Sequence, residues 1–253
     1  MNRTGPLVAL TIAALVGLVF GIYPELDLAL ARFFLTSSGK FIPSRWMMAA
    51  REASTWLVVG LVAVVVLALL AKLILPRRRL LVPVRAMIFL MATLVLAPGL
   101  VVNAGLKDNW PRSRPIDVTQ FGGNERFVAW WDPRGECPAN CSFVSGEGSA
   151  AFWALAPAAL TPPTWRAAAY GVAVAFGAGI SVLRMAFGAH FLTDVVFAGV
   201  LTFLIIWLVH GLIYRWPATR LSEEKLERAI ERVAIPVHDF LRGTNRRSGR
   251  EGA

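Results

Sequence analysis

Long apolar runs separated by polar segments are the feature of this chain that most restricts its possible folds. A helix of about 20 apolar residues can cross the roughly 30 Å hydrocarbon core of a bilayer. Within that core every backbone N–H and C=O group must be paired inside the protein, which a helix achieves by itself. We therefore predict an all-α polytopic membrane protein with six transmembrane helices at Leu7–Tyr23, Thr55–Leu75, Val84–Leu106, Ser149–Leu160, Ala167–Phe187 and Phe191–Tyr214.

The fourth run is the shortest, and small residues extend it on both sides, from near Ser145 to Thr164. Composition supports a membrane protein, because 56% of the 253 residues are hydrophobic and 17% are charged, against about 25% charged residues in a typical soluble domain. The same composition excludes a disordered chain and a small disulfide-rich secreted protein.

The net charge of +10 could indicate a nucleic-acid partner, so the position of the charges decides its meaning. With both termini in the cytoplasm, six spans leave sixteen basic and six acidic residues on the inner side. The outer segments hold ten basic and ten acidic residues. The whole excess lies on one side, as the positive-inside rule requires, and we expect a lipid bilayer and no nucleic acid as partner. Nothing in the sequence indicates the oligomeric state.

Three segments lie outside the predicted spans. Residues 24–54 mix apolar and charged side chains and are expected to rest on the outer surface, either where lipid enters or as simple packing. The polar segment 107–144 is too long for a mere connector and is expected to be a functional loop. Residues 1–220 would form the membrane domain, and residues 221–253 a cytoplasmic amphipathic helix, capped by Ser222, followed by a disordered basic end with Arg246, Arg247 and Arg250.

The only two cysteines, Cys137 and Cys141, both fall in this outer loop. In an oxidising compartment their spacing suits a small loop closed by a disulfide, although a pair of free thiols is the alternative. A metal site is not expected, because no histidine neighbours the cysteines in sequence.

Three groups of residues that can carry chemistry occur at the outer ends of spans. The first group has three cations, Lys107, Arg112 and Arg114, within eight residues, a density that suits a multiply charged anion. Interfacial cations that extend toward the lipid head groups are the alternative. The second group opens the fourth span with Ser145 and Gly146, whose donors can cradle an anion or simply cap the helix.

The third group joins the last two spans and contains Arg184, His190 and Asp194. His190 and Asp194 are four residues apart at the start of a helix. The carboxylate can therefore hydrogen-bond one imidazole nitrogen and leave the other free as a nucleophile or base. A buried structural pair is the alternative. Together the three groups predict a site that binds and attacks a phosphate.

These groups resemble the signature of the type-2 phosphatidic acid phosphatase superfamily of membrane lipid phosphatases, which is K-x6-RP, then PSGH, then SR-x5-H-x3-D. The resemblance covers residues 107–194 and implies a bundle in which spans three to six carry the site. It assigns phosphate binding to Lys107, Arg114, Ser145, Gly146 and Arg184. It also makes His190 the nucleophile that forms a phosphohistidine and Asp194 its orienting partner. Asn109, Arg112 and Arg126 are expected to support the head group.

The chain departs from this signature at three positions. Val144 replaces the proline and Leu183 replaces the serine, changes that should alter the geometry little. Glu147 replaces the histidine that protonates the leaving oxygen in the family. A carboxylic acid could do the same work if it stayed protonated, but three neighbouring cations favour the ionised form, so acid catalysis by Glu147 is a hypothesis.

The resemblance implies a phosphoric monoester hydrolase of the bacterial inner membrane that needs no metal or other cofactor and whose site faces the periplasm. Its overall similarity to bacterial lipid A phosphatases makes a lipid A phosphate the first expectation for the substrate. Undecaprenyl diphosphate, phosphatidylglycerol phosphate and phosphatidic acid are the alternatives. A lipid phosphotransferase and a non-catalytic protein that binds anionic lipid also remain open.

Overall fold

A computed structural model of the chain describes residues 4–75 and 82–241. Over these residues the secondary structure is helical, apart from one isolated bridge between Val118 and Glu125. The elements, in chain order, are α1 (Thr4–Ile22), α2 (Glu25–Arg32), α3 (Arg45–Ile74), α4 (Val84–Leu94), η1 (Val95–Lys107), η2 (Pro115–Asp117), η3 (Thr119–Phe121), α5 (Gly146–Phe152), α6 (Leu155–Ala159), α7 (Pro163–Ala186), α8 (Leu192–His210), η4 (Gly211–Arg215) and α9 (Glu223–Leu241).

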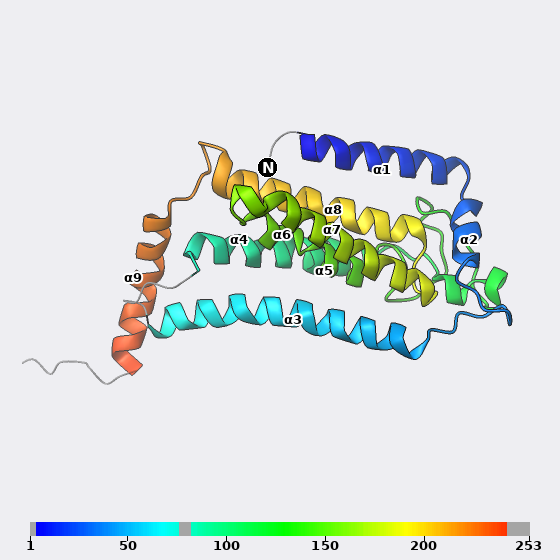
Figure 1. Cartoon of the computed structure of the whole chain (residues 1–253), viewed down its shortest axis with the longest axis horizontal. Helices are drawn as coiled ribbons and strands as arrows, with labels where there is room; N and C mark the ends of the chain where they lie inside the picture. The colour runs from blue at the N-terminus through cyan, green and yellow to red at the C-terminus, as the bar shows by residue number, and fades with distance from the viewer. Residues whose placement is uncertain (1–3, 76–81, 242–253) are drawn as a thin grey trace, which may run out of the picture.

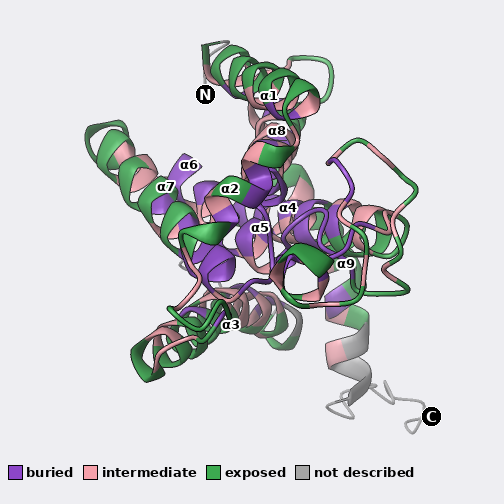
Figure 2. Cartoon of the chain, turned by 90° about the vertical axis from the view of Figure 1, so that its right-hand side faces the viewer, coloured by how far each residue is buried: buried purple, intermediate pink, exposed green. Residues whose placement is uncertain are grey.

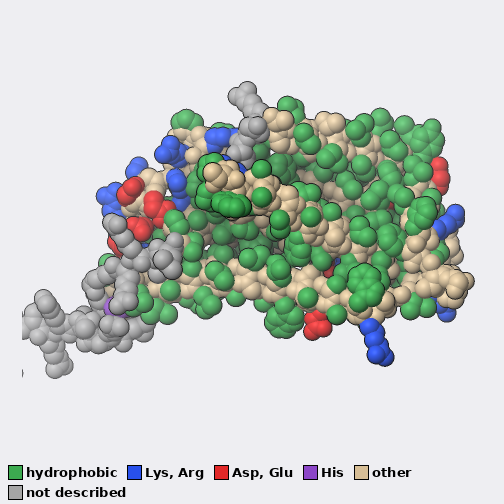
Figure 3. All heavy atoms as spheres, viewed as in Figure 1, with side chains coloured by type: hydrophobic (Ala, Val, Ile, Leu, Met, Phe, Trp, Pro, Cys, Tyr) green, Lys and Arg blue, Asp and Glu red, His purple; other side chains and the backbone are tan. Residues whose placement is uncertain are grey.

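Five helical segments are long and apolar enough to cross a membrane, and they run side by side along the long axis (Figure 1). They are Thr4–Ile22, Arg45–Lys72, Val84–Lys107, Pro163–Ala186 and Leu192–Arg215. Hydrophobic side chains cover the middle of the visible face, and most charged side chains gather toward its two ends (Figure 3). The expected all-α membrane bundle is confirmed, whereas the count of six spans stays a prediction.

The predicted fourth span is two short helices, α5 and α6, joined by a turn at Trp153 and Ala154. At 1.5 Å per residue, the segment from Gly146 to Ala159 extends about 21 Å, which is short for a complete crossing. Most of its residues are buried, and it lies at the centre of the bundle (Figure 2). Its small residues let the surrounding helices approach closely.

Phe152 shows how tightly α5 packs between α7 and α8. A Cβ atom added to Gly177 of α7 would lie 2.3 Å from the Phe152 ring, and one added to Gly199 of α8 would lie 2.9 Å from it. Only glycine at both positions lets the ring lie against the two backbones. This contact fixes the depth of α5 and therefore the position of the residues at its start.

The third predicted span changes helix type part-way along its length. It begins as α4 and continues as the π-helix η1, which contains Pro98. Proline has no N–H group to donate along the helix, so the regular α-helical pattern cannot pass through it. The side-chain amide of Asn103 donates to the Pro98 carbonyl at 2.6 Å, so this carbonyl has a hydrogen-bond partner inside the protein.

The segment expected to rest on the surface, residues 24–54, is divided between two helices. Residues 25–32 form α2, which lies across the end of the bundle near residues 108–145 (Figure 1). The second span begins at Arg45, ten residues before the expected Thr55, because Ser44 caps the helix there by accepting from the N–H of Met47 at 3.4 Å. The polar first turns of α3 therefore reach beyond the apolar run. We call this end of the bundle the loop end.

The opposite end, which we call the tail end, carries α9. This helix begins after Ser222, as predicted, and the Ser222 hydroxyl accepts from the N–H of Lys225 at 3.2 Å. Its Leu226 and Ile230 pack against the core of the bundle, while Val233 is exposed. Part of the apolar face of this amphipathic helix is therefore used inside the protein.

Two contacts of glutamate side chains hold α9 to the bundle. The Glu223 carboxylate accepts from the N–H groups of Val84 and Arg85 at 2.6 and 3.1 Å, and thus caps α4. Glu231 pairs with the buried Lys72 of α3 at 3.1 Å. The expected basic end with Arg246, Arg247 and Arg250 lies outside the described residues.

Candidate active site

The site residues come together at the loop end, where the turn between α7 and α8 meets the start of α5. α7 ends at Ala186, and Gly188 then adopts a φ of +65°, a conformation that residues with a side chain rarely adopt. This turn reverses the chain and places His190 two residues before α8. The carbonyl of Asp194 accepts from the N–H of Ser145 at 3.2 Å, which joins the start of α8 to the start of α5.

His190 is only 1% exposed, and a hydrogen bond to the backbone fixes its ring. Its Nδ1 lies 2.8 Å from the backbone carbonyl of Ser142. A carbonyl oxygen only accepts, so Nδ1 must carry the proton. The lone pair is therefore on Nε2, which is the form an imidazole needs to act as a nucleophile.

The expected hydrogen bond between Asp194 and His190 is not formed. Asp194 Oδ2 lies 3.9 Å from Nδ1, beyond hydrogen-bonding distance. Instead Oδ2 accepts from the Ser142 hydroxyl at 2.5 Å and from the N–H of Phe191 at 2.8 Å. Asp194 thus orients the imidazole through Ser142, whose side chain it holds and whose carbonyl holds the ring. The spacing of four residues predicted the pair but not this intervening serine.

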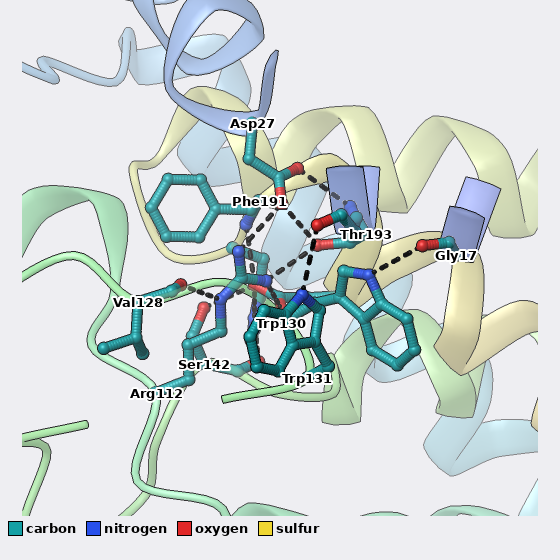
Figure 4. A network of polar contacts seen from close by, with 12 residues as sticks. Gly17, Asp27, Arg112, Val128, Trp130, Trp131, Ser142, Phe191 and Thr193 are labelled. Atoms are coloured by element: carbon teal, nitrogen blue, oxygen red, sulfur yellow. Dashed lines mark hydrogen bonds and ion pairs between the residues drawn. The ribbon is translucent and has the colours of Figure 1, made fainter. Parts of the chain in front are cut away.

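Arg112 is fully buried and joins two carboxylates from different helices. Its guanidinium donates to Asp194 Oδ1 at 2.5 Å and to Asp27 Oδ2, on α2, at 2.8 Å. It also donates to the Thr193 hydroxyl at 2.7 Å and the Val128 carbonyl at 3.2 Å (Figure 4). The expectation that Arg112 supports a head group is wrong, because all these bonds are internal and no part of the side chain reaches the surface.

The three cations assigned to phosphate binding are near enough to His190 for their charges to act on its ring. Arg184 is 8% exposed, and within the described part of the chain its Nε has no hydrogen-bond partner. Arg114 is half-buried and donates to the Asn140 carbonyl at 2.5 Å. Lys107 ends η1, with its Nζ 3.5 Å from where a Cβ of Gly146 would lie. The buried donor on Arg184 is the clearest sign of an anion-binding site, because such a group is costly unless a ligand satisfies it.

The surroundings keep His190 uncharged. Burial, and after it the positive charges of Arg184, Arg114 and Lys107, lower the pKa of His190 well below its ordinary value of 6.5, against a smaller opposing effect of the Ser142 carbonyl. The neutral ring is the reactive form. A phosphate bound among these cations would therefore meet a lone pair on Nε2 at neutral pH.

Glu147, the residue that departs from the expected signature, is held by two arginines. Arg51 of α3 donates to its carboxylate from Nε at 3.0 Å and from Nη2 at 2.6 Å. Arg184 Nη1 lies 3.5 Å from the same carboxylate. Burial raises the pKa of Glu147, but the Arg51 hydrogen bonds and the charges of Arg184, Arg51 and Lys107 outweigh it and leave the pKa below 4.5. The carboxylate is ionised at neutral pH, which argues against proton donation.

Comparison with known proteins agrees with this site. Residues 85–218, more than half of the chain, match the model of the PAP2 superfamily. The chain belongs to the PAP2 superfamily. It is 32% identical over 219 residues to the lipid A 4′-phosphatase of Francisella tularensis subsp. novicida (strain U112), an alignment that covers 85% of this chain and 98% of that protein.

A second relative from this superfamily is the lipid A 4′-phosphatase of Rhizobium leguminosarum. The two chains are 38% identical over 117 residues, which is 46% of this chain and 50% of that protein. No solved structure was found to match the chain. The expected enzyme class, a membrane lipid phosphatase that hydrolyses a phosphoric monoester, is confirmed by the PAP2 family and its relatives.

Other sequence-predicted residues of this PAP2 protein have different surroundings. The Asn109 amide donates to the carbonyls of Ala104 and Gly105 and so caps η1, which is not the expected head-group contact. Arg126 is exposed and donates to the Arg134 carbonyl at 2.9 Å. The sulfur atoms of Cys137 and Cys141 are bonded to each other.

Ser145 is fully buried at the start of α5, and its hydroxyl accepts from the N–H of Gly148 at 3.1 Å. Gly146 follows it as the first residue of that helix. Of the two expected roles, capping the helix or binding an anion, Ser145 fills the first. Its hydroxyl proton is still available to an anion. The phosphate-binding role assigned to Ser145 and Gly146 stays a prediction.

Sequence reasoning missed three residues that shape the site. Asp27 and Arg51 lie far from the signature in sequence, and each was part of a segment expected on the surface. Ser142 lies three residues before Ser145 of the second group, but its role depends on both its hydroxyl and its carbonyl. For Asp27 the available signal was its position between Leu26 and Leu28, because a carboxylate among apolar residues usually has a buried partner.

Proposed function

We propose that this membrane lipid phosphatase removes the 4′-phosphate of lipid A through a phosphohistidine on His190. The observation that carries the proposal is the hydrogen bond between Nδ1 of His190 and the Ser142 carbonyl, which leaves the lone pair on Nε2. No described residue is hydrogen-bonded to Nε2, and the charges of Lys107, Arg114 and Arg184 act on the same ring. The choice of lipid A rests on the relative aligned over 98% of its own length.

In the first step Nε2 of His190 forms a bond to phosphorus as the bond from phosphorus to the sugar oxygen breaks. The positive charges of Lys107, Arg114 and Arg184 stabilise the charge on the equatorial phosphate oxygens, and the Ser145 hydroxyl adds a donor. Asp194, acting through Ser142, keeps Nδ1 protonated and balances the positive charge that develops on the ring. The leaving oxygen takes its proton from water.

In the second step water attacks phosphorus, the bond to Nε2 breaks and inorganic phosphate leaves. The ionised Glu147 accepts the proton of the attacking water and then gives it to the hydroxide ion left by the first step, which restores the carboxylate; its lowered pKa keeps it in the ionised form that this role requires. Glu147 is thus assigned as a general base, in place of the acid that the signature position suggested. No step uses a metal ion.

We also propose that the loop end faces the periplasm and that both termini are cytoplasmic. Under this arrangement residues 1–220 form the membrane domain, whose site is closed by the loop at residues 107–144. Residues 221–253 form a cytoplasmic extension. The proposal is supported by the sixteen basic residues that it places on the inner side.

The proposed activity is tested by phosphate release from detergent-purified protein in the presence of a chelator. The substrates are lipid A, undecaprenyl diphosphate, phosphatidylglycerol phosphate and phosphatidic acid. We expect release from lipid A to be fastest, to be lost in His190→Ala and to survive in His210→Ala, a control at the far end of α8. Faster release from another lipid would show that this lipid, and not lipid A, is the preferred substrate. Transfer to a second lipid without phosphate release would make the protein a phosphotransferase.

A further inference from the structure

Beside the phosphate site a narrow groove of about 120 Å³ opens between α3, α5 and α7. Its volume is about four times that of one water molecule. The groove has a polar end formed by Glu147, Ser54 and Thr55, and its other side chains are apolar: Val58, Val59, Ala150, Ala151, Phe176 and Ile180.

The polarity of the groove changes in one direction. On α3 the chain runs from Arg51 at the polar end to Val59 further toward the tail end, and on α5 it runs from Glu147 to Ala151 in the same direction. On α7 the apolar residues Ile180 and Phe176 lie on the tail-end side of Arg184. Along α5 and α7 the change from a charged residue to the apolar groove residues takes about one helical turn, or roughly 6 Å, and along α3 it takes about two turns.

The polar end of the groove is continuous with the phosphate site. Glu147 lines the groove and is also 3.5 Å from Arg184, the cation with the unpaired Nε. A molecule whose phosphate contacts Arg184 has its remaining atoms within reach of this end. The groove is also open toward the bilayer, because few residues of α3 are buried and Val59 is 47% exposed. Figure 2 shows α3 standing at the margin of the bundle with its outer side exposed.

We propose that this groove binds one acyl chain of the phosphorylated lipid substrate. A hydrocarbon chain fits an apolar groove within the membrane, and a phosphate at its polar end would meet the cations of the site. Ala150 and Ala151 provide the space, because larger side chains there would fill it. This inference rests on the proposed lipid phosphatase activity and adds the binding site for the substrate's apolar part.

The test compares two substrates with the same diphosphorylated disaccharide: lipid A and lipid A from which all acyl chains have been removed chemically. Two variants fill the groove, Val58→Trp and Ala150→Phe. Val64→Trp is the matched control, since Val64 lies on α3, is 60% exposed and does not line the groove. The measurement is kcat/KM for each substrate, alongside thermal unfolding in detergent.

We expect the wild-type preference for lipid A over the deacylated compound to fall about 15-fold or more in both groove variants. Each buried methylene contributes a factor of about four, and at least two would be displaced. The control should keep the preference. A preference unchanged in both groove variants would assign the groove to bulk lipid or a neighbouring chain and overturn the inference. A wild-type protein that cleaves neither compound would instead overturn the proposed function.

Discussion

The two nitrogen atoms of His190 have different surroundings, and this difference defines the chemistry of the site. Nδ1 faces the Ser142 carbonyl, whereas Nε2 is left for the substrate. Asp194 Oδ2 lies 3.9 Å from Nδ1, too far for a hydrogen bond, so Asp194 acts on the ring through Ser142. Glu147 replaces the histidine of the signature, and Arg51 and Arg184 keep it ionised. At this scale the sequence identifies the reacting residue, while the hydrogen-bond partners that set its protonation require the folded structure.

The pH dependence of kcat/KM should reflect the surroundings of His190. The reactive form is the neutral ring, and its pKa is lowered well below 6.5 by burial and by the charges of Arg184, Arg114 and Lys107. Protonation should therefore inactivate the enzyme only below the ordinary range of histidine, and the rate should stay constant from pH 8 down to about pH 6.5. Arg114→Gln removes one positive charge and should move the acidic limb to higher pH. An acidic limb centred at or above pH 6.5 in the wild-type profile would contradict this description.

At the scale of elements, four segments distant in sequence meet at Arg112. Asp27 of α2 precedes this arginine by 85 residues, and Asp194 follows it by 82 on α8.

Five of the predicted spans appear as helices because long apolar runs are a strong signal. The polar start of α3 at Arg45 and the π-helix that contains Pro98 were not predicted, since the hydrophobic pattern carries no information about either.

Arg112 and Arg114 are two residues apart, but replacing each by alanine should have a different main effect, on folding stability for Arg112 and on kcat/KM for Arg114. Arg112→Ala leaves the buried carboxylates of Asp27 and Asp194 without their cation, which should cost about 3–5 kcal/mol of folding stability. Arg114→Ala should change stability by no more than about 0.5 kcal/mol and reduce kcat/KM strongly. Unfolding in detergent and kcat/KM would be measured for both variants. Equal stability of the two would show that Arg112 is not the structural cation described above.

At the scale of the whole molecule, the charges divide the protein into two ends. The loop end carries the catalytic groups, and α9 closes the tail end across the spans (Figure 1). The groups assigned to catalysis are close to a boundary of the apolar band, where a phosphate can remain in water while acyl chains stay in hydrocarbon. The excess of basic residues on one side predicts that the tail end lies in the cytoplasm, and this orientation stays a prediction.

Orientation can be tested with single cysteines placed at the two ends. In a background where Cys137 and Cys141 are serine, Asn124→Cys lies in the exposed loop and Lys225→Cys on the exposed side of α9. A membrane-impermeant maleimide added to intact spheroplasts should label position 124 and should label position 225 only after lysis. Labelling of position 225 in intact spheroplasts would reverse the proposed topology.

The most direct test of the central claim is to trap the phosphohistidine. Glu147→Gln removes the base for the second step, so the phosphorylated form should accumulate when this variant is incubated with lipid A and quenched. Peptide mass spectrometry should then find a phosphate on His190 that is stable in alkali and released in acid. The double variant with His190→Ala and Glu147→Gln should carry no phosphate. Slow turnover by Glu147→Gln with no phosphate on His190, or with phosphate on another residue, would contradict the mechanism.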